Sequence, residues 1–214
     1  MDSSAARNMM VDSQIRPNKV TDRRIIDAMR QLPRENFVPP ASRALAYADE
    51  DVPLGNGRVM LEPMVIARLV QLAAVQPGER VLVVACGTGY GAALLAACGA
   101  VVTAVDDDAG LLARARAAGG AGVTIVEGDT AAGWPSGGPY DAVLVEGAIA
   151  HVPPALAAQV KRPGGRLVAV LRGEGKVGQA VCGMPAGEGL SFRTAFDCGT
   201  ALLPAFRQVP GFVF

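Results

Sequence analysis

The stretch Val81-Leu-Val-Val-Ala-Cys-Gly-Thr-Gly-Tyr90 decides the fold. Its valines and leucine are typical of a strand that is buried on both faces of a parallel sheet. Gly87-Thr88-Gly89 forms a tight turn whose small residues let the backbone approach a ligand. An alanine-rich segment and a second valine cluster, 101–105, follow. Strand, turn, helix and strand in this order predict a βαβ unit, with a ligand crevice at the carboxyl ends of its strands.

The same alternation continues toward the C-terminus. Strands are predicted at 81–85, 101–105, 123–126, 141–145 and 166–171, with helices near 90–97, 108–118 and 153–161. Two further strands, 180–184 and 191–196, are expected to close the sheet as a pair. We therefore predict an α/β fold with a doubly wound, mostly parallel sheet of seven strands.

The N-terminal part is predicted to consist of helices and loops. A helix capped by Thr21 or Asp22 is stopped by Pro33, and a second helix spans 63–74. The proline- and glycine-rich stretch 52–57 between them is expected to be a loop. The length of 214 residues suits one domain, in which 1–78 form the helical and loop region and 79–214 form the α/β core.

Composition excludes several classes of partner and site. The 20 basic and 20 acidic residues cancel, so nothing favours a nucleic acid or an anionic membrane. The four cysteines form no C-x-x-C pair and the only histidine, His151, is not grouped with them, so no metal site is expected. The N-terminus has no apolar signal segment, and reduced cysteines fit a cytoplasmic protein.

One segment is long enough to span a bilayer. No charged residue occurs between Arg80 and Asp106. Glycines interrupt the segment early and valines cluster at its two ends, so we predict the βαβ unit instead of a membrane helix.

An acidic residue follows the second predicted strand. The carboxylate of Asp106 can accept hydrogen bonds from both hydroxyls of a ribose, although it can also serve as a helix cap, as can Asp107 and Asp108. The glycines and Ala92 also satisfy the dinucleotide pattern G-x-G-x-x-A, so an NAD-dependent oxidoreductase remains an alternative. The chain leaves little room for the catalytic domain that such an enzyme needs.

Six segments, taken in order, resemble the protein-L-isoaspartate O-methyltransferase family, which uses S-adenosylmethionine. Leu32-Pro-Arg-Glu-Asn-Phe-Val-Pro39 is similar to the family's V-P-R-x-x-F-V-P segment, and Tyr47-Ala-Asp-Glu-Asp-Val-Pro-Leu-Gly-Asn-Gly57 to its Y-x-D-x-x-L-P-I-G-x-G loop. The segment from Leu82 to Tyr90 lies where the family has L-E-I-G-T-G-S-G-Y.

The other three segments lie further along the chain. Glu127-Gly-Asp-Thr130 with Gly133-Trp134 resembles G-D-G-x-x-G-W, and Pro139-Tyr-Asp-Ala-Val-Leu-Val145 resembles P-Y-D-x-I-x-V. His151-Val-Pro-Pro-Ala-Leu156, followed by Gln159 and Gly164-Gly165, is similar to I-P-x-x-L, Q-L and G-G. The resemblance implies the class I methyltransferase fold, with methyl transfer from S-adenosylmethionine to the carboxyl of isoaspartyl residues in damaged proteins.

The resemblance also implies a cofactor site without a metal. Its residues would be Cys86, Gly87, Thr88, Gly89, Tyr90, Asp106, Asp107, Gly128, Asp129 and Thr130. The loop glycines would contact the methionine end of the donor, Asp106 the ribose and Asp129 the adenine. Asp129 is equally suited to a turn after the third strand. No catalytic residue is assigned.

The sequence departs from the family where the acceptor would bind. The family's G-Q-T-I-S-Q-P-H-M aligns on Gly57-Arg-Val-Met-Leu-Glu-Pro-Met-Val65. Leu61 therefore replaces the family's active serine, Val59 its threonine and Met64 its histidine. Arg58 replaces a glutamine. We expect its side chain to face solvent, and the alternative is that it supplies a positive charge for an acidic substrate. Apolar neighbours raise the cost of burying a carboxylate, so the acceptor can differ from an isoaspartyl residue.

The cofactor loop departs as well. Val83 replaces the family's glutamate, which would hold the methionine end of the donor, and no compensating residue is identified. Ala85 replaces its first glycine and is tolerated only if its backbone φ is negative; otherwise the strain is about 1 kcal/mol.

Three hypotheses follow. The first is a methyltransferase acting on isoaspartyl proteins or peptides, or on a small-molecule acceptor. The second is a non-catalytic binding or interaction protein on the same fold, favoured by Leu61, Val83 and Ala85. The third is the NAD-dependent oxidoreductase.

Overall fold

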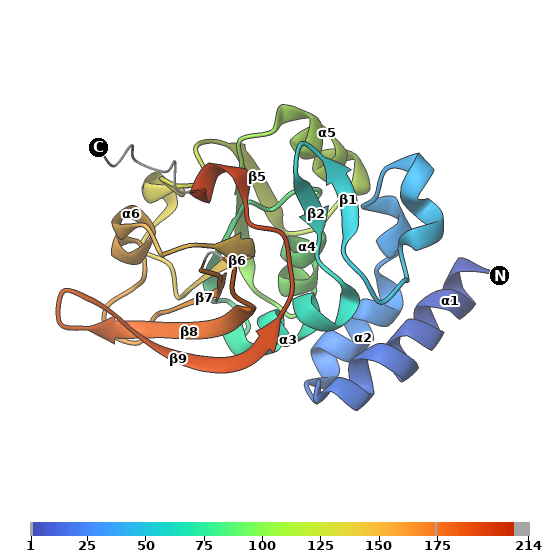
Figure 1. Cartoon of the computed structure of the whole chain (residues 1–214), viewed down its shortest axis with the longest axis horizontal. Helices are drawn as coiled ribbons and strands as arrows, with labels where there is room; N and C mark the ends of the chain where they lie inside the picture. The colour runs from blue at the N-terminus through green and yellow to red at the C-terminus, as the bar shows by residue number, and fades with distance from the viewer. Residues whose placement is uncertain (1, 174, 208–214) are drawn as a thin grey trace.

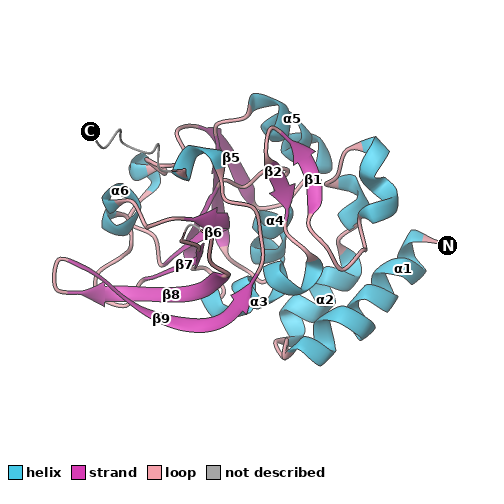
Figure 2. Ribbon diagram, in the orientation of Figure 1, coloured by secondary structure: helices cyan, strands magenta, loops and turns pink. Residues whose placement is uncertain are grey.

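The computed structural model describes residues 2–173 and 175–207, and the last part of the expected domain, 208–214, lies outside the described residues. A seven-stranded sheet forms its centre, in the order β5-β4-β3-β6-β7-β8-β9. Its strands are β3 (Arg80–Val84), β4 (Val101–Asp106), β5 (Val123–Glu127), β6 (Ala142–Ile149), β7 (Arg166–Leu171), β8 (Gly178–Ala186) and β9 (Gly189–Cys198). The first five run parallel, whereas β8 and β9 are antiparallel (Figure 2). The predicted fold class is confirmed.

Helices cover both faces of this sheet. They are α1 (Ser3–Met10), α2 (Arg23–Gln31), α3 (Pro63–Ala73), α4 (Tyr90–Ala97), α5 (Ala109–Ala118) and α6 (Pro154–Ala158). One apolar core contains Val83 and Leu144 together with residues of α1 to α4, and the second contains Val84 and Val145 together with residues of α6. Figure 1 shows α1 and α2 side by side at one end of the molecule.

The strand order reverses at β3. Chain connections run from β3 outward to β4 and β5, and then return to β6 on the other side of β3. Ligands of open α/β sheets bind at such a switch point, outside the carboxyl ends of the strands. The loop 85–89 leaves β3 at this point, so the topology puts the predicted cofactor loop where a ligand crevice is expected.

The prediction that residues 52–57 form a loop is wrong. β1 (Val52–Gly55) and β2 (Arg58–Met60) form a small antiparallel ribbon, and the connecting residues Asn56 and Gly57 have φ angles of 51° and 72°. Asn-Gly with both residues at positive φ is the preferred two-residue hairpin turn. Pro53 and Gly55 conceal the alternating strand pattern, whereas the Asn-Gly pair itself was an available signal.

The other boundaries agree with the prediction to within two residues, except that β6 runs four residues beyond the predicted end at 145. The predicted helix 153–161 is a second exception and is shorter, because α6 ends at Ala158. None of the helices in the described ranges 2–173 and 175–207 combines the length and apolar content that crossing a membrane requires.

Candidate functional site

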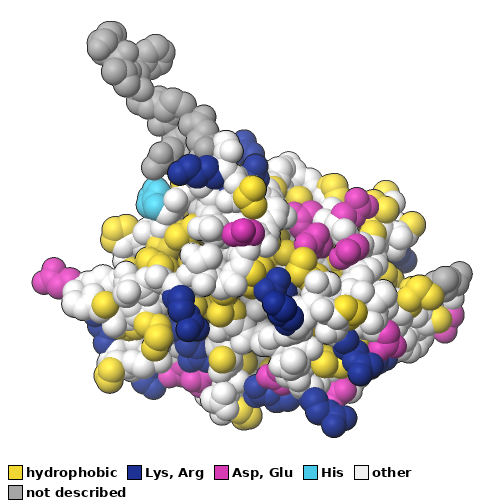
Figure 3. Space-filling model, turned by 60° about the horizontal axis from the view of Figure 1, so that its bottom comes forward, with side chains coloured by type: hydrophobic (Ala, Val, Ile, Leu, Met, Phe, Trp, Pro, Cys, Tyr) yellow, Lys and Arg dark blue, Asp and Glu magenta, His cyan; other side chains and the backbone are white. Residues whose placement is uncertain are grey.

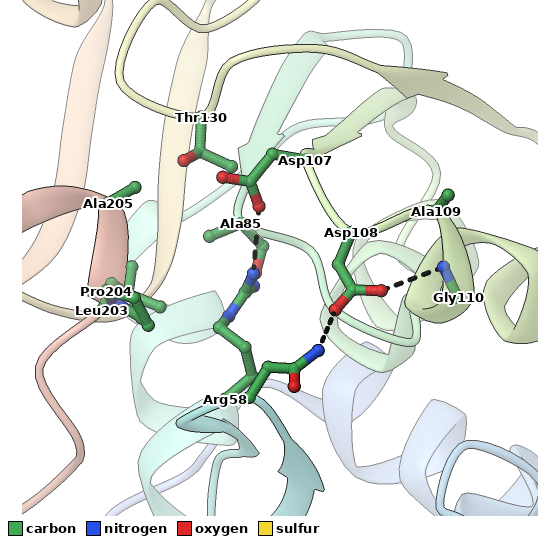
Figure 4. Close-up of a pocket in the computed structure, with 11 residues that line it drawn as sticks. Arg58, Ala85, Asp107, Asp108, Ala109, Gly110, Thr130, Leu203, Pro204 and Ala205 are labelled. Carbon is green, nitrogen blue, oxygen red and sulfur yellow. Dashed lines mark hydrogen bonds and ion pairs between the residues drawn. The ribbon is translucent and has the colours of Figure 1, made fainter.

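A cleft of about 460 Å³ lies at the carboxyl ends of β3 and β4 (Figure 4). Five segments form its walls: the β1–β2 ribbon, the loop after β3, the junction of β4 and α5, the loop after β5, and the segment around a short 3-10 helix, Pro204–Phe206. Its lining residues are Asn56, Arg58, Ala85, Asp107, Asp108, Ala109, Gly110, Thr130, Leu203, Pro204 and Ala205. Residues far apart in the sequence therefore meet around one opening.

The loop that follows β3 requires unusual backbone conformations. Gly87 and Gly89 have φ angles of 55° and 86°, which glycine adopts without cost. Ala85 also has a positive φ, 56°, and is buried. A left-handed alanine costs about 1–2 kcal/mol. The condition of a negative φ at this position is not met, so the alanine strains the loop.

Two of the predicted loop residues direct their side chains away from the cleft. The Tyr90 ring is buried, lies edge-on to Phe37 at 5.3 Å between ring centroids, and has the Arg34 guanidinium 4.7 Å from its centroid. Cys86 is buried, and burial raises the pKa of its thiol well above the usual value. Neither residue is among those that line the cleft, so their side chains are not available to a ligand bound there.

The side chain of Thr88 behaves differently. It is buried, and its Oγ1 has no hydrogen-bond partner among the described residues. Gly89, next in the loop, is the N-cap of α4. An unpartnered hydroxyl beside a helix N-terminus is a feature that a polar ligand can satisfy.

Asp106 is the last residue of β4 and is fully buried. Arg58 donates to both of its oxygens, through Nη1 to Oδ1 at 2.9 Å and through Nη2 to Oδ2 at 2.8 Å. The backbone N–H of Gly87 donates to Oδ2 at 2.7 Å and that of Asp108 to Oδ1 at 3.1 Å. Both oxygens of the predicted ribose acid therefore already carry charged and backbone partners.

Arg58 reaches this position from β2. It is 7 % exposed, and Nη2 also donates to the carbonyl oxygen of Ala85 at 2.8 Å. Burial lowers the pKa of its guanidinium, but the hydrogen bonds and charge of Asp106 outweigh burial and leave it raised. The expectation of a solvent-facing arginine is wrong, because a buried carboxylate 48 positions away draws the side chain inward.

The two neighbouring acids have separate roles. Asp107 lines the cleft, with an Oδ1 3.6 Å from Arg58 Nη1, and partial burial together with Asp106 raises its pKa. Asp108 caps α5 by accepting the N–H groups of Gly110 and Leu111 at 2.9 and 3.0 Å. Asn56 donates to the other oxygen of Asp108 at 3.0 Å, which links the ribbon turn to the start of α5.

The predicted adenine residues lie after β5. Asp129 is exposed and accepts the N–H of Ala131 at 2.8 Å, as a turn residue does. Thr130 is buried, lines the cleft, and has an Oγ1 without a partner among the described residues. The ring of Trp134 lies beside Gly128, since a Cβ there would be 3.4 Å from it. The structure thus brings Gly87, Asp106, Asp107 and Thr130 together.

Leu61 lies away from this cleft. Its side chain is buried in the core and its carbonyl oxygen accepts Arg34 Nη2 at 2.5 Å. A serine hydroxyl at this place would need a polar partner in apolar surroundings.

One buried acid, Glu146 in β6, was not predicted from the sequence as a site residue. The residue is 8 % exposed and its Oε1 has no partner among the described residues. Burial raises the pKa of its carboxyl to about 8, Asp106 adds to the shift, and Arg58 and Arg34 oppose it. A charge inside the apolar run 142–149 was the available signal.

Comparisons with known proteins agree on one family. A family model described as protein-L-isoaspartate(D-aspartate) O-methyltransferase matches residues 5–181. The protein-L-isoaspartate O-methyltransferase of Methylorubrum extorquens (strain PA1) is 45 % identical over 170 residues, which are 78 % of this chain and 74 % of that protein. The protein of the same name in Anaeromyxobacter dehalogenans (strain 2CP-C) is 46 % identical over 154 residues, covering 70 % and 73 %.

A solved structure has the same fold. A protein-L-isoaspartate O-methyltransferase superposes with a TM-score of 0.79 and 22 % identity. The superposition covers 92 % of this chain and 65 % of the other, longer one.

Proposed function

Because this chain belongs to the protein-L-isoaspartate O-methyltransferase family, we propose that it transfers a methyl group from S-adenosylmethionine to the carboxylate of isoaspartyl residues in proteins or peptides. The family match over residues 5–181 is the observation that carries this proposal. The position of the cleft at the switch point of the sheet supports it.

The reaction asks for positioning more than for acid–base chemistry. S-adenosylmethionine supplies an electrophilic methyl group on a sulfonium. A carboxylate with a pKa near ~4 is already ionised at neutral pH and needs no general base. One of its oxygens forms the new bond to the methyl carbon as the carbon–sulfur bond breaks and its electron pair stays on sulfur. The protein must hold the three atoms in line and exclude water.

The cleft fits such a donor on one condition. Thr130 lines the cleft, and its hydroxyl has no hydrogen-bond partner among the described residues. The hydroxyl of Thr88, likewise without a partner there, and the backbone turn at Gly87 and Gly89 belong to the adjoining loop after β3. Asp106 can accept from ribose hydroxyls only when Arg58 withdraws from at least one of its oxygens. Donor binding therefore includes a movement of Arg58.

A non-catalytic binding protein on the same fold is the second candidate. The strained Ala85, the apolar Leu61 and the occupied Asp106 favour it. A methyltransferase that acts on a different, small-molecule acceptor is a variant of the first candidate. The NAD-dependent alternative receives no support from the family matches.

Location and other partners also belong to this proposal. Lys and Arg are interspersed with Asp and Glu over the face shown in Figure 3, which favours neither a nucleic acid nor an anionic membrane as partner. We infer that the protein acts in the cytoplasm and uses no metal. The ten predicted cofactor residues, and the division of the single domain at residue 78, remain proposals.

Ligand binding tests the function first. S-adenosylhomocysteine at one hundred times its dissociation constant should stabilise the fold by about 2.7 kcal/mol, measured as a rise in melting temperature, whereas NADH should not. Labelled methyl should then pass to an isoaspartyl peptide, with the same peptide containing normal aspartate as the control. If S-adenosylhomocysteine does not change the melting temperature, both the proposed methyl transfer and the proposed cofactor are wrong. Binding without transfer would favour the non-catalytic candidate or another acceptor.

A further inference from the structure

Glu146 occupies an irregular point in β6. Leu144 pairs with Val168 of β7 and Ala148 pairs with Val170, so four steps along β6 face two steps along β7. Gly147, inside this bulge, has a φ of 148°. Bulges bend a strand and change the direction of a side chain, and they are frequent beside active sites. The irregularity therefore coincides with the one acid of the strand.

The side chain of Glu146 points toward the helix that follows the cofactor loop. A Cβ built on Gly91, in the first turn of α4, would lie 2.4 Å from Glu146 Oε1 and 2.9 Å from Ile66 Cδ1. Gly91 thus leaves the space that the carboxyl fills. Ile66 belongs to the same apolar core as Val83, so Glu146 and Val83 face the same side of the sheet.

Register relates Glu146 to the acid that Val83 lacks. Val83 pairs with Leu144, so Glu146 is one strand across and two residues further toward the crevice. Strand spacings make this a displacement of about 8 Å. An acid absent from β3 is thus matched by an acid in β6 that lies nearer to the carboxyl end of the sheet.

Two acids now flank the loop that leaves β3. Asp106 ends β4 on one side, and Glu146 lies in β6 on the other. Asp106 carries a full set of partners, whereas Glu146 Oε1 carries none among the described residues. No cluster of metal-ligating side chains occurs in the parts of the chain that the structure describes, so a metal ion does not explain the acid.

We propose that Glu146 binds the α-ammonium group of S-adenosylmethionine, and that it takes over in β6 the anchoring task of the acid missing at Val83. This inference rests on the proposed function. An ammonium is the donor's only group that offers three N–H donors to a buried carboxylate and its neighbours. The adenosine part would lie on the β4 side of the loop and the amino acid part on the β6 side.

The test compares two ligands that differ in one group. One is S-adenosylhomocysteine, and the other is its deamino analogue, in which hydrogen replaces the α-ammonium. The wild-type protein should bind S-adenosylhomocysteine at least about tenfold more tightly, as a charge-assisted hydrogen bond predicts. Glu146→Gln should reduce this preference to within about twofold while the analogue binds as before. Glu188→Gln, in the exposed turn between β8 and β9, is the matched control and should keep the full preference.

A second measurement needs no variant. Burial raises the pKa of the Glu146 carboxyl to about 8, while the facing groups Arg58, Arg34 and Asp106 also bear on its ionisation. Ammonium binding requires the ionised form, so calorimetry at pH 7 in buffers of different ionisation enthalpy should show proton release with S-adenosylhomocysteine and less with the analogue.

The outcomes separate the two proposals. Failure of both ligands to bind the wild-type protein would reject the proposed function. Equal affinity of the wild-type protein for both ligands, or an undiminished preference in Glu146→Gln, would overturn the role of Glu146 and leave the function standing.

Discussion

Arg58 and Asp106 form an ion pair beside the cleft, and this pair has almost no access to water. The side chains are 7 % and 0 % exposed, and the contact is bidentate. Removing one member of a buried pair typically costs 3–5 kcal/mol, because the remaining charge is left without its partner. If the donor's ribose binds Asp106 as proposed, Arg58 competes with it for the Asp106 oxygens, and the same residue then opposes donor binding while it supports the fold.

Arg58→Gln restores the residue expected from the family resemblance and separates these two effects. We expect the free energy of unfolding to fall by about 3–5 kcal/mol. Affinity for S-adenosylhomocysteine should rise by about tenfold or more, since the ligand no longer displaces a charge-assisted pair. Denaturant unfolding and calorimetric titration measure the two quantities.

Arg166→Gln is the matched control for this variant. Arg166 is 12 % exposed and binds both oxygens of Glu79, at 3.0 and 2.6 Å, outside the cleft. It should lose stability without a gain in affinity. If Arg58→Gln binds the ligand more weakly than the wild-type protein, the pair does not compete with the donor.

Single residues divide clearly into those that spacing could predict and those it could not. Asp106 was placed from its position after a strand and a glycine turn. The inward path of Arg58 depends on a partner 48 positions away, and Glu146 on a bulge in register, neither of which has a local signature. For Ala85 the sequence predicted a possible strain, but whether the strain exists depends on the φ angle, which only the structure gives.

The β1–β2 ribbon is the element that carries Arg58 to the cleft. Its Leu54 packs on the cofactor loop, where a Cβ on Gly87 would lie 3.2 Å from Leu54 Cδ1. Its turn packs near the 3-10 helix, where a Cβ on Gly57 would lie 3.5 Å from Pro204 Cγ. The ribbon therefore covers one side of the cleft, and its turn conformation fixes where the guanidinium sits.

Gly57→Ala tests the turn. The added methyl group meets only ordinary contacts, so the cost is that of a left-handed alanine, about 1–2 kcal/mol of unfolding free energy. Gly199→Ala is the control, because a Cβ there meets nothing within 4 Å and the backbone φ is not positive. Chemical denaturation should show Gly199→Ala neutral or stabilised by up to ~1 kcal/mol. Equal losses in both variants would contradict a left-handed requirement at Gly57.

Element types were predictable wherever a continuous apolar run or a helical spacing of apolar residues was clear in the sequence. Valine-rich runs and the intervening helices gave β3 to β7 to within a few residues. The ribbon was missed because its strands span only four and three residues and contain a proline, so no alternation develops. Its Asn-Gly turn was a stronger signal than the strands that it joins.

At the scale of the whole molecule, one buried acid makes the stability of the fold depend on pH. Burial raises the pKa of Glu146 from 4.5 to about 8, so between these values the folded protein binds more protons than the unfolded chain. Its contribution to stability is full below pH 4.5 and is lost as pH rises through about 8. Glu79 and Asp141 act in the opposite sense, since hydrogen bonds from Arg166 and Lys161 lower their pKa values, and their contribution is lost only in acid.

Stability should therefore decline between pH 5 and pH 8 by about 3–4 kcal/mol, the part of the full pKa shift that falls within this pH range. Denaturant unfolding at several pH values measures the slope. Glu146→Gln should flatten it, because the amide does not titrate. A wild-type protein as stable at pH 8 as at pH 5 would show that Glu146 is ionised and compensated in the folded state.

The bulge in β6 has one more consequence. Where β6 leaves its register with β7, the N–H of Ala148 donates to Ala201 and its carbonyl oxygen accepts from Leu203, at 3.1 and 2.8 Å. One wall of the cleft is thus a short segment that is held on β6 by two backbone hydrogen bonds and by the packing of Leu203 and Phe206. Two further hydrogen bonds join Thr200 to Arg172 and Asp51. Such a segment can detach as a small cooperative unit while the seven strands stay paired. Under the proposed function, the contacts around residue 203 therefore bear on how long a donor stays bound, in addition to the stability of the whole fold.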